Sequence, residues 1–205
     1  NLPIVPITDL AIKDDNLIAA TQGRSLWIID DLTPLHQLNE ATLKKEMVLY
    51  KPKDAYNLSG GNGKTSRTAG TNHAGGVAVN YYIKKVNEKD SISISFFDLN
   101  DVLIKKYALK PDKEKGEEEL KIEDGNNVFN WDMTYPGAEK VEEMILWWAS
   151  LDGPMALPGN YKVELAVNGV IETQLFTILK NPVSEATESE MKAQFDFIND
   201  INTKM

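Results

Sequence analysis

Apolar and polar residues alternate along most of residues 77–180, which is the pattern of strands that bury one face. Serine alternates with isoleucine or phenylalanine over 91–96, and residues 161–167 alternate as strictly. Asn168-Gly169 follows, a dipeptide that favours a two-residue hairpin turn. About seven strands are predicted, over residues 77–83, 92–96, 102–108, 127–132, 144–148, 161–167 and 170–179. Short strands with frequent turns predict an all-β fold of the immunoglobulin- or fibronectin-like β-sandwich type.

Three shorter strands are predicted ahead of this region, over residues 7–12, 17–20 and 25–29. Their close spacing is that of a meander such as a propeller blade. Thr33 followed by Pro34 is typical of a helix start, with Thr33 as the cap, and predicts a short helix over residues 34–40. A strand over 47–51 and a Gly-rich polar loop over 52–76 follow.

The period changes to a helical one near the end of the chain. Met191, Phe195 and Ile198 recur at the spacing of one helix face, and Thr187 with Glu190 forms a capping-box pair. These residues predict an amphipathic helix over 187–204.

Composition removes several classes of function. The 205 residues carry 31 acidic and 22 basic side chains, a net charge of −9, so a nucleic-acid partner is not expected. The absence of cysteine excludes disulfides and thiolate chemistry. No stretch has the length of an apolar membrane span, and the charged run over 110–119 is interpreted as a solvated loop. Because Asn1 is not followed by a leader pattern, we expect the chain to start inside a longer protein or after a processed leader.

Two groups of residues carry a resemblance to a known family. The first is Ile7-Thr8-Asp9-Leu10-Ala11-Ile12 with Ala20-Thr21-Gln22-Gly23-Arg24-Ser25-Leu26-Trp27-Ile28-Ile29-Asp30-Asp31. The second is Asn127-x-Phe129-x-Trp131-Asp132-x-x-Tyr135-Pro136-Gly137, then Met144-Ile145-Leu146-Trp147, then Gly153-Pro154-x-Ala156-x-Pro158-Gly159-x-Tyr161. In this order they resemble the C-terminal region of bacterial sialidase-repeat β-propeller proteins. That family is often labelled glycosyl hydrolase and is similar to the sortilin ectodomain propeller.

The resemblance implies an upstream propeller in the same protein, which would be this chain's partner, and a secreted, periplasmic or cell-surface location. No Ser-x-Asp-x-Gly-x-x-Trp repeat and no sialidase catalytic set of arginines, tyrosine and carboxylates is present in this chain. We therefore assign it no catalytic residue, cofactor or metal, and the activity of the parent protein stays open.

Trp147 and Trp148 are the candidate ligand-binding residues. Neighbouring residues of a strand face opposite sides, so one of the two rings is expected in the core and the other at the surface. An exposed tryptophan on a β-sandwich can stack on a sugar ring. It can equally pack against the propeller or the terminal helix.

Arg67 and His73 lie in the Gly-rich loop over 57–76, which could reach over the mouth of the propeller. The run Gly60-Gly61-Asn62-Gly63-Lys64-Thr65 lacks the first glycine of a phosphate-binding loop, so we reject that interpretation. Asp132 is expected to cap a turn. Asp98, Asn100 and Asp101 could bind calcium, but a hairpin turn explains them as well.

We interpret residues 1–31 as terminal propeller-blade strands, 32–76 as a linker, 77–180 as the sandwich and 187–204 as a terminal helix. Three functions are then compatible with the sequence. The chain could be a non-catalytic accessory or scaffold module that packs on the propeller. It could be a carbohydrate-binding module that uses Trp147 or Trp148, or it could contribute Arg67 and His73 to a glycosidase site.

Overall fold

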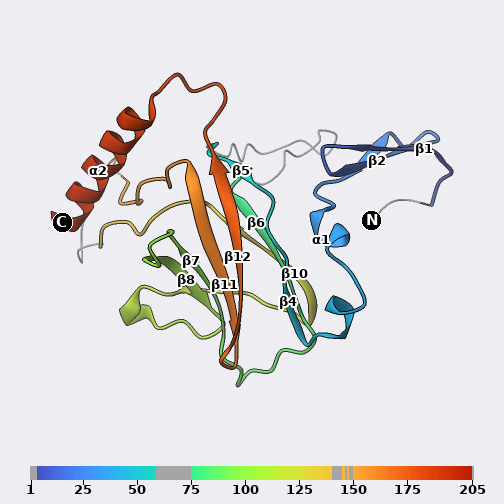
Figure 1. Cartoon of the computed structure of the whole chain (residues 1–205), viewed down its shortest axis with the longest axis horizontal. Coiled ribbons are helices and arrows are strands. Elements are labelled where there is room, and N and C mark those ends of the chain that lie inside the picture. The colour runs from blue at the N-terminus through green and yellow to red at the C-terminus, as the bar shows by residue number, and fades with distance from the viewer. Residues whose placement is uncertain (1–3, 59–74, 140–144, 146, 148–149, 205) are drawn as a thin grey trace.

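Alternating apolar residues form the strands of two sheets that face each other across one core. The computed structural model describes residues 4–58, 75–139, 145, 147 and 150–204. Figure 1 shows these two sheets at the centre, a small three-stranded sheet on one side and a C-terminal helix on the other. The expected β-rich class with a terminal helix is therefore confirmed.

The larger sheet has six strands in the order β5-β12-β11-β7-β8-β9. In that order they are Ala55–Tyr56, Val170–Leu179, Gly159–Val167, Ile92–Phe97, Leu103–Ala108 and Glu118–Glu119. The smaller sheet has the order β10-β6-β4, and its strands are Gly125–Trp131, Val77–Ile83 and Met47–Leu49. The two short edge strands β5 and β9 pair in parallel, and the longer strands pair antiparallel.

Aromatic rings fill the space between the two sheets. Trp131 at the end of β10 is fully buried, and its ring stacks on Phe96 of β7 with centroids 4.5 Å apart. Tyr161 and Phe176 approach the same indole edge-on. Offset and edge-on contacts of this kind stabilise a core beyond the burial of area alone. Phe129, two residues before Trp131 in β10, is partly buried and packs against this cluster.

Side chains of β12 form hydrogen bonds with the backbone of β4 at one corner of the sandwich. Glu172 accepts a hydrogen bond from the buried Leu49 N–H at 2.7 Å, and Gln174 donates to the Leu49 carbonyl at 3.1 Å. Both backbone groups of one edge residue are thereby satisfied without a strand partner. Lys45 pairs with the second carboxylate oxygen of Glu172.

The hairpin predicted at Asn168-Gly169 is confirmed. Both residues have positive φ angles, 50° and 87°, as a two-residue turn of the primed type requires. The Asn168 side-chain oxygen also accepts from the Ser91 N–H, which ties the turn to the start of β7.

The small sheet consists of β1 (Ile7–Lys13), β2 (Asn16–Thr21) and β3 (Leu26–Ile29), close to the predicted ranges. Two short helical segments, α1 (Thr33–His36) and η1 (Thr42–Lys44), connect this sheet to β4. The helix predicted over 34–40 is therefore shorter, and Thr33 is not its cap. Leu32 occupies the cap position, and the Asp31 carboxylate accepts from the Thr33 N–H instead.

The terminal helix α2 (Glu188–Lys204) starts at the predicted capping box. The Thr187 N–H donates to the Glu190 carboxylate at 2.8 Å, and the Glu190 N–H donates back to the Thr187 hydroxyl. The helix contacts the sandwich through Phe195, whose ring packs edge-on against that of Tyr135 with the ring centroids 4.8 Å apart.

Other segments also differ from their predictions. The charged run expected as a solvated loop contains the short helix η2 (Lys113–Lys115) and β9, and Glu117 is only 11% exposed in its pair with Lys106. Most of the strand predicted over 144–148 lies outside the described residues. Ile145 and Trp147, which are described, are not in a strand.

Candidate functional site

The three-stranded sheet carries apolar side chains on both of its faces. The strand register places two rows on one face, Leu10–Ala19–Trp27 and Ile12–Leu17–Ile29. The opposite face contains the row Ala11–Ile18–Ile28 and, beside it, Ala20 with Leu26. Sheets that are covered on both faces have near-continuous apolar strands of this kind.

Both faces are nevertheless open to solvent in this chain. Every residue of β1 and of β3 is exposed, and β2 is half-buried. The large exposed side chains include Leu10 at 60%, Ile12 at 68%, Leu26 at 64% and Ile28 at 55%. The outer edges of β1 and β3 pair with no strand of the described residues. Exposed apolar surface of this extent is typical of interaction sites in proteins.

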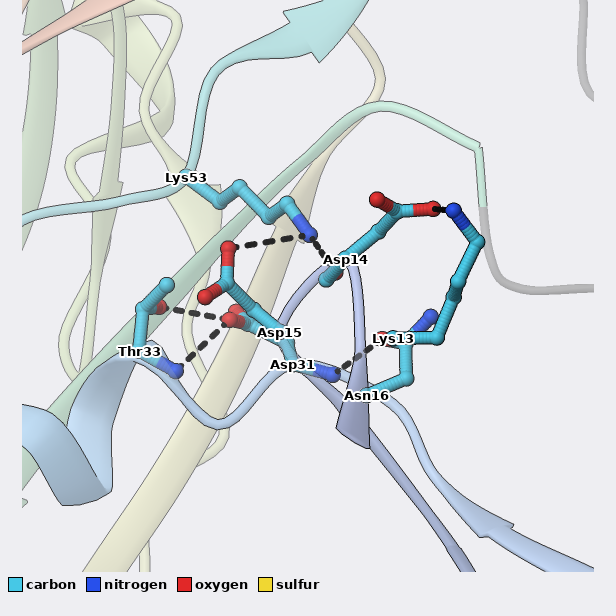
Figure 2. Close-up of polar contacts among 7 residues, drawn as sticks. All are labelled: Lys13, Asp14, Asp15, Asn16, Asp31, Thr33 and Lys53. Carbon is cyan, nitrogen blue, oxygen red and sulfur yellow. Dashed lines mark hydrogen bonds and ion pairs between the residues drawn. The ribbon is translucent and has the colours of Figure 1, made fainter. Parts of the chain in front are cut away.

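A polar joint connects this sheet to the sandwich (Figure 2). We define it as residues 14–16 of the β1–β2 turn, residues 31–33, and Lys53. The Asp15 carbonyl accepts from the Leu32 N–H at 2.6 Å, and the Asn16 side chain accepts from the Asp31 N–H at 3.0 Å. The turn is thereby held against the start of α1.

Lys53 approaches the same turn from the other side (Figure 2). Its ammonium donates to the Asp14 carbonyl at 2.7 Å and lies 3.6 Å from the Asp15 carboxylate. A cavity of about 380 Å³ lies beside the joint and is lined in part by Asp30, Asp31 and Lys53. In the part of the chain that is described, no group of three or more carboxylates or histidines is arranged to hold a metal.

A groove of about 970 Å³, lined by both polar and apolar residues, lies at another corner of the sandwich, between β8 and the segment after β10. Lys105 donates to the Thr134 hydroxyl at 2.9 Å, and that hydroxyl donates to Asp132 at 2.7 Å. Asp132 also accepts from the Thr134 N–H, so it caps a turn as predicted. Lys105 lines the groove, and its side chain is only 16% exposed.

Fixed charges line the wall of the groove. The Asp112 N–H and the Lys106 ammonium both contact the Glu117 carboxylate, and these contacts lower the pKa of Glu117. Lys115, paired with Asp112, lies at the same wall. The groove thus offers donors and acceptors side by side, an arrangement that suits a polar, uncharged ligand.

The residues predicted to bind ligand are distributed as follows. Trp147 is 85% exposed and lies in the segment between β10 and β11. Trp148, Arg67 and His73 lie outside the described residues, and their roles stay predictions. The strand argument for one buried and one exposed ring does not hold at Trp147, since that residue is not in a strand.

The segment 98–101, for which the sequence left calcium binding or a hairpin turn open, forms a turn. The Asp98 carboxylate accepts from the N–H groups of Asn100 and Val102, at 2.8 and 2.9 Å. This is the hairpin turn that the sequence also allowed.

Sequence reasoning missed the joint and the groove. Lys53 lies in a polar linker, and nothing local distinguishes it from Lys51. The Asp14 carbonyl to which it donates is 39 residues away in the chain, and only the fold brings the two together. The apolar faces of the small sheet had a visible signal, because 17–20 and 26–29 are almost wholly apolar.

Comparisons of the sequence with protein-family models, curated proteins and solved structures gave no match. The resemblance to sialidase-repeat proteins therefore stays a prediction from the residues. Within the described residues, no helix has both the length and the apolar character needed to cross a membrane.

Proposed function

We propose that this chain is a non-catalytic interaction module of a larger, secreted β-propeller protein. The small sheet packs against other sheets of the propeller, and the sandwich, of immunoglobulin-like type, is an accessory domain beside it. The observation that supports this proposal is a three-stranded sheet that is apolar and exposed on both faces. A sheet of three strands needs a packed face for its stability.

A propeller supplies such an environment, because each blade packs between two neighbouring blades. The resemblance of residues 7–12 and 20–31 to terminal propeller strands supports the same placement. The sandwich has its own closed core, so it can fold beside the propeller without becoming part of it.

Hydrogen exchange of the backbone amides tests the proposal. In the isolated chain, β1 and β3 are expected to exchange fast, whereas β7 and β11 are protected by the core. In the full-length parent protein, β1–β3 should become at least about tenfold slower, since local opening then requires apolar faces to leave their partners.

The sandwich strands serve as the internal control, because their exchange should be the same in both proteins. Equal exchange of β1 and β3 in the isolated chain and in the parent would contradict the proposal. Ile12→Glu and Ile28→Glu, one on each face, should each remove the added protection.

A carbohydrate-binding function is the second candidate, and two observations favour it. The Trp147 ring is 85% exposed, and aromatic rings at the surface can stack on sugar rings. The groove with Lys105, Thr134 and Asp132 offers the paired donors and acceptors that sugar hydroxyl groups need. Trp148 stays part of this hypothesis. The glycosidase alternative with Arg67 and His73 stays a prediction.

Glycan binding by the chain tests this candidate. If the module binds sugars, a panel of sialylated and plant-type glycans should contain a ligand with saturable binding. Trp147→Ala or Lys105→Met should then weaken that binding by about tenfold, which corresponds to the loss of one stacking or hydrogen-bonding contact. Trp27→Ala, which removes an exposed tryptophan of the small sheet, is the matched control and should bind as the parent chain does. The absence of binding across the panel would remove this candidate.

A further inference from the structure

Among the described residues, polar contacts rather than packing of β1 or β3 connect the small sheet to the sandwich. All of β1 and β3 is exposed, so these strands bury no side chain against the sandwich. The small sheet is connected to the sandwich by the short polar contacts of the joint (Figure 2). The contacts of the joint therefore determine the orientation of the small sheet relative to the sandwich.

Lys53 belongs to the sandwich by its backbone. The next residue, Asp54, accepts from the Thr177 N–H of β12 at 3.1 Å, and β5 then pairs with the end of the same strand. The side chain of Lys53 extends from this anchored segment to the β1–β2 turn, where it meets Asp14 and Asp15. One side chain thus crosses from the sandwich to the small sheet.

The backbone of the joint has an unusual conformation at three residues. Asp14 and Asp15 have φ angles of 50° and 63°, and Asp31 has 63°, so three residues of the joint adopt the left-handed region. Aspartate tolerates that region better than most residues. Leu32, whose N–H donates to the Asp15 carbonyl, is buried, with 6% of its surface exposed.

We infer that Lys53 is a positioning residue, which fixes the angle between the three-stranded sheet and the sandwich. This inference rests on the proposed function, since the small sheet is the docking element there. With Lys53 in place, the sandwich takes one position beside whatever the sheet packs against. Without Lys53, the hydrogen bonds that the Asp31 and Leu32 N–H groups donate to the β1–β2 turn leave the small sheet free to rotate about the start of α1.

Distances between two spin labels, measured by pulsed electron paramagnetic resonance, test this inference on the whole chain. The chain has no native cysteine, so Arg24→Cys at the far end of the small sheet and Lys89→Cys in the sandwich allow specific labelling. Lys53→Met should broaden the distance distribution, because it removes one hydrogen bond and one exposed ion pair between the two parts. Since such contacts contribute only a modest free energy, the expected broadening is about twofold. Lys51→Met, two residues away and also exposed, should leave the distribution unchanged.

Two further variants separate the contacts. Asp15→Asn removes the ion pair and keeps the hydrogen bond to the Asp14 carbonyl, so it should broaden the distribution less than Lys53→Met. Lys53→Arg restores a cationic donor and should restore the narrow distribution. A Lys53→Met distribution that superimposes on that of the parent chain would overturn the inference. The measurement needs no propeller, so its result is independent of the exchange experiment that tests the proposed function.

Discussion

Trp131→Ala is expected to lower the free energy of unfolding by about 3–5 kcal/mol, the usual cost of deleting a buried aromatic ring. The Trp131 side chain is fully buried and contacts the rings of Phe96, Tyr161 and Phe176. Its loss leaves a cavity between the two sheets that neighbouring rings fill only in part. Urea unfolding followed by far-ultraviolet circular dichroism measures the effect without relying on the deleted fluorophore.

Trp131→Phe should behave very differently. The indole Nε1 is buried and has no hydrogen-bond partner among the described residues, and an unpaired buried N–H costs about 1–3 kcal/mol. Phenylalanine removes that group and keeps most of the ring, so the net cost should be about 1 kcal/mol or less. A loss as large as that of Trp131→Ala would show that the indole N–H makes a stabilising contact in solution.

Gly76→Ala is expected to lower the free energy of unfolding by about 3 kcal/mol, for two reasons that add. Gly76 has a φ angle of 98°, which side chains strongly disfavour. A Cβ atom there would also lie 2.1 Å from the carbonyl oxygen of Trp131, which is backbone and cannot turn aside. The start of β6 and the end of β10 would have to separate.

Gly116→Ala separates the two causes. Gly116 also has a positive φ angle, 69°, but a Cβ atom there would meet nothing within 4 Å. This control should cost about 1 kcal/mol, the conformational part alone. Thermal unfolding of both variants measures the difference. Equal losses would mean that the approach of Gly76 to Trp131 is not tight in solution.

Local patterns predicted the strands well, because the side chains of a half-buried strand alternate with period two. Residues 161–167 and 170–179 contain this alternation, and Asn168-Gly169 supplies the positive φ angles of the turn between them. The capping box at Thr187 is a similar case, since its two hydrogen bonds join residues three positions apart. In each case, the interacting groups are neighbours in the chain.

Prediction failed where the partner of a residue is distant. β5 has only two residues, and it is a strand because it pairs with the end of β12. Prediction also failed at one local feature, the start of α1. The Thr33 N–H donates to the Asp31 carboxylate two residues before it, and Leu32 occupies the cap position.

The sequence by itself determined that the chain is β-rich, that its strands turn at Asn168-Gly169, and that an amphipathic helix ends it. It also contained the apolar runs of the small sheet, although not the fact that both faces lie open. Only the tertiary structure decided which polar residues meet. Lys53 reaches Asp14 across 39 residues, and Glu172 reaches Leu49 across 123. The reason is physical: backbone periodicity and turn chemistry act between near neighbours, whereas a side-chain contact between sheets depends on the strand order that folding sets.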